Sequence, residues 1–137
     1  MRFCKCGWIL MVILFLCVLN VAAFEKKEFI AGIDPDGIQR VEVLGGSYFF
    51  NPNYIIVKVN MPVEMNMRME PGLIPHNIVL NAPDAGMDIS LELNSKPQVI
   101  RFTPTRTGNY TFYCDKKPPF LKSHKDKGMF GTLEVRN

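Results

Sequence analysis

The chain has 137 residues, a length that suits one domain with a single hydrophobic core. Its 16 basic and 13 acidic residues leave a net charge of only +3. With no broad basic excess and no nucleic-acid-reading motif, the composition excludes a nucleic-acid-binding protein.

The N-terminal segment has the organisation of a secretory leader. Two basic residues and no acid precede an unbroken apolar run (residues 7–19), and Val-Ala-Ala follows shortly after it. The run is shorter than the roughly 20 residues that span a bilayer. We therefore predict a signal peptide over residues 1–23, cleaved after Ala23, and an exported, periplasmic domain over residues 24–137. The alternative is an uncleaved leader that anchors the domain to the outer face of the inner membrane.

Cleavage would change the cysteine content decisively. It removes Cys4, Cys6 and Cys17, leaves Cys114 as the single thiol, and lowers the net charge to +1. A single cysteine forms no disulfide within its own chain. It is therefore an intermolecular bridge, a reactive thiol, a buried side chain or a metal ligand.

A long alternation of apolar and polar residues is the strongest secondary-structure signal. Side chains on a strand alternate between two faces, so this pattern predicts one buried face and one solvated face. Pro62 predicts a break or bulge between two strands within the run. The apolar positions are Ile55, Val57, Val59, Met61, Val63, Met65, Met67 and Met69.

Other short strand-like segments follow one another with Pro-, Gly- and Asn-containing turns between most of them, and no stretch has a useful helical period. This spacing predicts an all-β fold, an antiparallel β-sandwich of seven to eight strands with Greek-key connections. The segments are residues 41–43, 47–50, 76–80, 89–93, 98–103, 108–114 and 131–136.

Four potential metal ligands occur in the order His76, Cys114, His124 and Met129. Nine residues separate Cys114 from His124, and four separate His124 from Met129. A loop of that size at the end of a sandwich brings three ligands together, and His76 joins them from another strand. Thiolate and thioether favour Cu(I), and imidazole accepts both copper oxidation states. The set therefore predicts a site for one copper ion.

The sequence resembles the cupredoxins, the small blue copper proteins that include plastocyanin, azurin, auracyanin and rusticyanin. The resemblance implies that His76, Cys114 and His124 are equatorial copper ligands and that Met129 is the long axial ligand. It also implies that Tyr110 braces the Greek-key corner and that Asn77 ties the two ligand loops together. Its carriers are Tyr48-Phe49-Phe50-Asn51-Pro52, His76-Asn77, Thr107-Gly108-Asn109-Tyr110-Thr111-Phe112-Tyr113-Cys114, and His124 through Met129 into Gly131-Thr132-Leu133-Glu134-Val135.

The segment between Cys114 and His124 is longer than in plastocyanin or azurin. It is more similar to the expanded loop of the type 1 copper domain in copper nitrite reductases. Its basic and apolar side chains are candidates for docking a redox partner, and an acidic partner would suit the lysines. The candidate docking residues, in and just after this segment, are Lys116, Lys117, Phe120, Lys122 and Lys125.

These observations predict an exported, monomeric electron carrier that cycles between Cu(I) and Cu(II), rather than an enzyme. It would touch a membrane only through a retained leader. Two alternatives stay open. One is catalytic redox chemistry at a non-blue copper with an open coordination position. The other is copper trafficking or storage on the methionines at positions 65, 67 and 69, although their alternation favours a role in the core.

Overall fold

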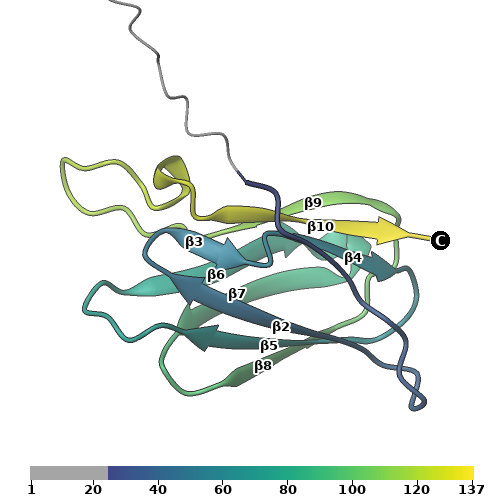
Figure 1. The fold of residues 1–137 in the computed structure, drawn as a ribbon. Helices are drawn as coiled ribbons and strands as arrows, with labels where there is room; N and C mark the ends of the chain where they lie inside the picture. The colour runs from purple at the N-terminus through teal and green to yellow at the C-terminus, as the bar shows by residue number, and fades with distance from the viewer. Residues whose placement is uncertain (1–24) are drawn as a thin grey trace, which may run out of the picture.

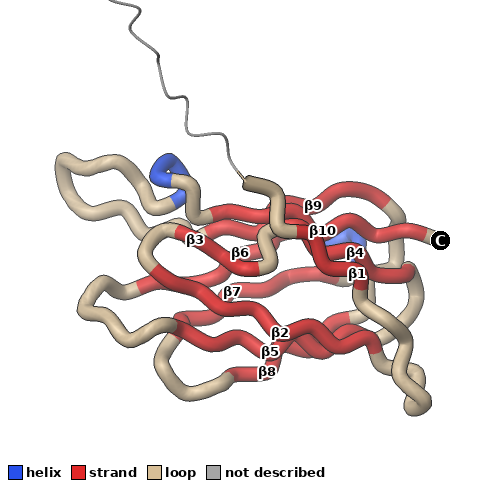
Figure 2. Tube along the Cα trace, viewed as in Figure 1, coloured by secondary structure: helices blue, strands red, loops and turns tan. Residues whose placement is uncertain are grey.

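A computed structural model describes residues 25–137 as two β-sheets packed face to face (Figures 1 and 2). The predicted leader, residues 1–23, lies outside the described residues. The larger sheet has the order β1 (Glu28–Ile30), β4 (Tyr54–Lys58), β10 (Phe130–Arg136), β9 (Gly108–Tyr113), β6 (His76–Ala82) and β7 (Met87–Leu93). The smaller sheet has the order β3 (Phe49–Asn51), β2 (Gln39–Gly46), β5 (Val63–Met69) and β8 (Gln98–Phe102). Two short 3-10 helices, η1 (Pro83–Ala85) and η2 (Lys125–Lys127), complete the described elements.

The long alternating run divides between the two sheets. Its first part forms β4 in the larger sheet and its second part forms β5 in the smaller one, with the predicted break at Pro62 between them. Ile55 on β4 and Met65 and Met67 on β5 are buried in one hydrophobic core. The alternation therefore supplies the inner faces of both layers, and the core interpretation of Met65 and Met67 is confirmed.

The prediction of an all-β sandwich is confirmed, with two differences in detail. The described residues form ten strands, and one of them, β1, was not anticipated because three residues are too few to show alternation. Three pairings are parallel: β1 with β4, β4 with β10, and β2 with β5. Period-2 alternation reports which face a side chain occupies and carries no information on the direction of the neighbouring strand.

The structure contains, among residues 25–137, no helix with the length and apolarity needed to cross a bilayer.

Two aromatic contacts hold β9 in position. The Tyr110 hydroxyl donates a hydrogen bond to the carbonyl of Arg106 at 3.0 Å and so braces the chain as it enters β9. Phe112 pairs across the strands with Gly131 of β10, and its ring contacts Phe50 with 5.4 Å between ring centroids. A β-carbon added to Gly131 would overlap the Phe112 ring and lie 2.6 Å from the carbonyl oxygen of Asn53. Gly131 therefore leaves the space that the buried phenyl ring fills.

We expect Gly131→Ala to destabilise the protein by about 1–3 kcal/mol, because the added methyl group overpacks a filled core position. Gly32→Ala is the matched control, since a β-carbon at Gly32 meets nothing within 4 Å. Chemical denaturation of both metal-free variants measures the difference. Equal stability of the two variants would contradict the packing of Phe112 on Gly131.

Candidate metal centre

The candidate ligands come from strand ends that the larger sheet places together. His76 is the first residue of β6, and Cys114 directly follows the last residue of β9. These two strands are antiparallel neighbours, with Val79 opposite Tyr113. The start of one strand and the end of the other therefore lie at the same end of the sandwich. His124 immediately precedes η2 and belongs to the chain that returns to this end.

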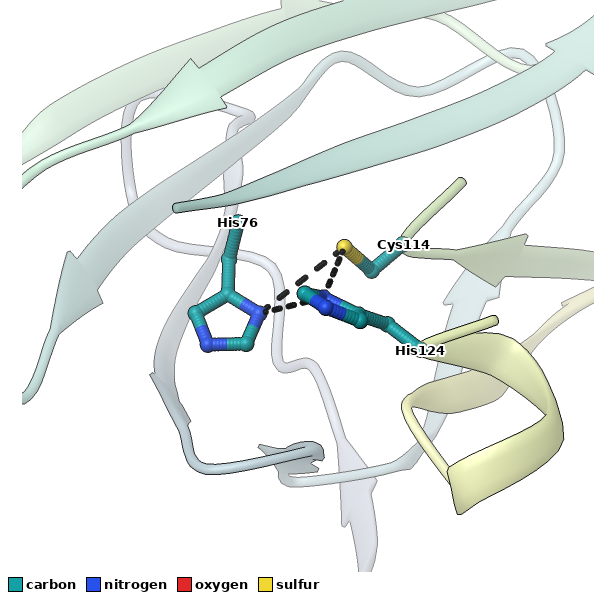
Figure 3. A group of neighbouring side chains, drawn as sticks. All are labelled: His76, Cys114 and His124. Carbon is teal, nitrogen blue, oxygen red and sulfur yellow. Dashed lines mark hydrogen bonds between the residues drawn. The ribbon is translucent and has the colours of Figure 1, made fainter. Parts of the chain in front are cut away.

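Three donor atoms converge at this end, as Figure 3 shows. The Nδ1 atoms of His76 and His124 are 3.1 Å apart. The Cys114 Sγ atom lies 3.4 Å from Nδ1 of His124 and 3.9 Å from Nδ1 of His76. All three side chains are buried, with exposed fractions of 3% for His76, 0% for Cys114 and 1% for His124. One metal ion of ordinary size would be within reach of all three atoms.

Backbone hydrogen bonds fix the segment that carries His124 and Met129. The N–H of Cys114 donates to the carbonyl of Met129 at 3.0 Å, and the N–H of Met129 donates to the carbonyl of His124 at 3.0 Å. The N–H of His124 in turn donates to the carbonyl of Lys116 at 2.8 Å. Met129 is fully buried in the core beside Cys114. The structure thus joins the backbones of Cys114, His124 and Met129 directly.

Burial makes the three donors electrically neutral before a metal binds. It raises the pKa of the Cys114 thiol, and the backbone N–H groups of Asn77 and Lys116, which hydrogen-bond to the sulfur, partly oppose this shift. Burial also lowers the pKa of His76, with a further lowering from His124. The pKa of His124 falls through burial first and then through the charges of Lys127 and Lys116. Neutral imidazole is the form that binds metals.

Asn77 connects the two ligand-bearing segments. Its side-chain amide donates to Asp115 Oδ1 at 2.7 Å, and its Oδ1 accepts from the backbone N–H of Asp115 at 3.0 Å. Its own backbone N–H points at the Cys114 sulfur, 3.4 Å away. Asn77 therefore joins the residue after His76 to the residue after Cys114.

The ligand loop, residues 115–123, projects from the metal end of the sandwich (Figure 1). Phe120 lies in the turn that the hydrogen bond from the Leu121 N–H to the Pro118 carbonyl closes; it is fully exposed and has a positive φ of 61°. Lys117 and Lys122 are exposed, whereas Lys116 is half-buried and paired with Glu92 at 2.5 Å. Lys125, just beyond the loop, lies over the Tyr113 ring at 4.4 Å. Of the candidate docking residues, Lys117, Phe120 and Lys122 have the freest side chains.

Tyr48 is a neighbour of the site whose position the sequence did not indicate. Its ring meets the rings of both His76 and His124. Tyr48 belongs to one of the motifs that carry the cupredoxin resemblance, but it lies 28 residues before the first candidate ligand. Only the packing of the smaller sheet against the larger one brings it there.

Comparison with solved structures finds the same fold in several other domains. The metal-binding domain of a Cu(I)-exporting P-type ATPase from Streptococcus pneumoniae, solved with Cu(I), matches with a TM-score of 0.59 and 21% identity, over 82% of this chain and 99% of that chain. Auracyanin from Roseiflexus castenholzii matches with a TM-score of 0.55 and 17% identity, over 72% of this chain and 97% of that chain. The periplasmic domain of subunit II of cytochrome oxidase from Bradyrhizobium japonicum matches with a TM-score of 0.55 and 14% identity, over 72% of this chain and 83% of that chain.

No protein-family model and no curated protein sequence matches the chain. At the identities of the structural matches, the similarity establishes the fold alone. What the site can bind must therefore be inferred from the residues of this chain.

The donor set fits a single copper ion. One sulfur and two imidazole nitrogens converge in a buried place, and Met129, which carries a thioether, is joined to Cys114 and His124 by backbone hydrogen bonds. Two nitrogens, a thiolate and a weak axial thioether are the ligands of mononuclear electron-transfer copper sites. Cys114 Sγ accepts hydrogen bonds from the backbone. Otherwise the three ligand atoms chiefly face one another, and a soft metal ion placed between them would bind all three.

We expect copper binding at neutral pH to release about one proton, because the thiol is protonated and both imidazoles are neutral in the metal-free protein. The apparent affinity should then rise by about tenfold per pH unit below the thiol pKa, and more steeply where the imidazoles are also protonated. Anaerobic calorimetric titration with Cu(I) in buffers of different ionisation enthalpy counts the protons. Release of none would mean that Cys114 is already a thiolate, against the raised pKa.

Proposed function

We propose that this chain, which has the cupredoxin fold that its sequence predicted and a buried site that fits one copper ion, is an exported one-electron carrier. The observation that carries the proposal is the convergence of the Cys114 sulfur with the Nδ1 atoms of His76 and His124 at one end of a rigid sandwich. The predicted signal peptide, residues 1–23, supports export to the periplasm.

Each candidate ligand has a distinct role in this proposal. Cys114 would supply the thiolate, His76 and His124 the two nitrogens, and Met129 the weak axial thioether. Bound copper would supply a one-electron Cu(I)/Cu(II) couple, taking an electron from a reduced partner and passing it to an oxidised one. The backbone N–H of Asn77, aimed at the Cys114 sulfur, stabilises negative charge on that atom.

The protein scaffold restricts movement of the ligands. Cys114, His124 and Met129 are joined by backbone hydrogen bonds, and Asn77 couples the segment that follows Cys114 to β6. Side chains that are locked by such surrounding contacts keep their geometry when the charge of the site changes. This restriction suits electron transfer, in which little structural rearrangement should accompany the change of oxidation state.

Burial of the site favours electron transfer over the two alternatives. A catalytic copper needs an open coordination position that a substrate reaches, but His76, Cys114, His124 and Met129 are all buried. Trafficking on the methionine strand needs accessible thioethers, but Met65 and Met67 lie in the hydrophobic core and only Met69 is half-buried. A stoichiometry of one copper per chain is expected for the carrier.

The decisive test is an optical and EPR spectrum of the copper-loaded protein. We expect one Cu(II) per chain with intense thiolate-to-copper absorption in the visible range. Cys114→Ala should abolish that absorption and weaken copper binding, because it removes the only thiolate from the proposed ligand set. A wild-type spectrum without the thiolate band would overturn the proposal, and binding of two or more Cu(I) ions per chain would favour trafficking.

We further propose that the exposed part of the ligand loop docks an acidic redox partner. Lys122→Glu should slow oxidation of the Cu(I) protein by anionic ferricyanide roughly fivefold at 0.1 M ionic strength, because it reverses one exposed charge on the loop that ends at His124. It should speed the reaction with a cationic cobalt(III) complex. Stopped-flow measurements of both reactions provide the rates.

Lys58→Glu is the matched control for this experiment. Lys58 is an exposed lysine at the end of β4, away from the ligand loop, so its reversal should change both rates little. Equal effects of the two substitutions would place electron exchange elsewhere than at the ligand loop.

A further inference from the structure

One aromatic ring contacts both histidines of the candidate copper site. The centroid of the Tyr48 ring lies 4.9 Å from that of His124 and 5.8 Å from that of His76, with interplanar angles of 79° and 80°. The two imidazole centroids are 4.7 Å apart. Edge-to-face contacts of this kind are favourable and directional. Tyr48 therefore restricts the rotation of the same two rings that must turn their Nδ1 atoms toward Cys114.

The backbone of Tyr48 is held in an unfavourable conformation. Ser47 and Tyr48 are the two residues that connect β2 to β3, and Tyr48 has a φ of +66°. A positive φ at the second position of a tight turn is normally left to Gly or Asn, because a bulky side chain is strained there. Such a conformation persists where the surrounding structure demands it, and it is often associated with a functional site. Here the positive φ of Tyr48 places its ring against the rings of His76 and His124.

A lysine from the segment after His124 holds the outer side of this ring. Lys127 Nζ lies 4.2 Å from the Tyr48 ring centroid and 3.1 Å from its hydroxyl oxygen, to which it donates a hydrogen bond. The backbone N–H of Lys127 also donates to the carbonyl of His124 at 3.1 Å. The β2–β3 turn is thus connected to the His124 segment both through Lys127 and through direct ring contact.

We propose that Tyr48 is a positioning residue of the copper site: its ring holds the His76 and His124 imidazoles in the ligating orientation and separates them from water. This inference rests on the proposed copper function. The phenyl ring does the positioning, because the hydroxyl group bonds to Lys127 and not to a histidine. Tyr48 touches the ligands and acts on the metal only through them.

Replacing the ring should loosen the site without removing a ligand. We expect Tyr48→Ala to bind one copper but to release Cu(I) to a chelator about 10- to 100-fold faster, the range typical of residues that support metal ligands. Its Cu(II) EPR spectrum should change and its reduction potential should fall, because water that reaches the site stabilises the higher charge. Tyr48→Phe retains the ring and should match the wild type in all three measurements.

Tyr54→Ala controls for the loss of any half-buried tyrosine. Tyr54 lies on β4, its ring contacts Lys26 at 3.6 Å and its hydroxyl donates to Glu134, so it resembles Tyr48 in surroundings but does not take part in the site. Its removal should leave the spectrum and the copper release rate unchanged. If Tyr48→Ala does not fold, Tyr48→Gly replaces it, because glycine accepts the positive φ without strain.

NMR of the metal-free protein separates this inference from the proposed function. Side-chain signals of His76 and His124 should broaden or multiply in Tyr48→Ala, as their rings sample other orientations, and should stay sharp in Tyr48→Phe. A wild type without thiolate-to-copper absorption would overturn the copper function alone. Unchanged histidine signals, EPR spectrum and release rate in Tyr48→Ala would overturn the role of Tyr48, as would equal changes in Tyr54→Ala.

Discussion

The hydrogen bond from the Cys114 N–H to the carbonyl of Met129 is the contact on which the candidate site depends. It closes the chain between β9 and β10 at the point where the paired strands end. The N–H of Met129 then bonds to His124, and the N–H of His124 bonds to Lys116, so that the returning segment follows one path. Without this closure the nine residues between Cys114 and His124 would be a flexible loop, and His124 would have no defined distance from the sulfur.

Burial imposes the second constraint. A thiol and two imidazoles in a nearly water-free place have few partners besides one another, and the Nε2 atom of His124 is buried with no hydrogen-bond partner in the described part of the chain. Buried polar groups without partners are costly. Burial therefore keeps all three donors neutral, and a metal that binds them displaces the thiol proton. The same exclusion of water is consistent with the electron-transfer function proposed above.

Contacts around the donors come from segments distant in sequence. Asn77 on β6 joins the segment after Cys114 through a pair of side-chain hydrogen bonds with Asp115. Tyr48 reaches both histidines from the β2–β3 turn in the other sheet, and Lys127 connects that turn to the His124 segment. The two layers of the sandwich thus meet at the metal end, and changes in one layer are expected to affect the ligands held by the other.

The all-β class, the break at Pro62 and the candidate ligands His76, Cys114, His124 and Met129 follow from the sequence without a structure, because alternation and ligand type are local properties of the chain. Tertiary structure alone decided the parallel pairing of β2 with β5, since alternation does not encode strand direction. It alone placed Tyr48 against the histidines, because that contact depends on how the two sheets stack. It also decided which loop lysines have no ion-pair partner in the described part of the chain, since Lys116 forms an ion pair with Glu92 on β7, which is distant in sequence.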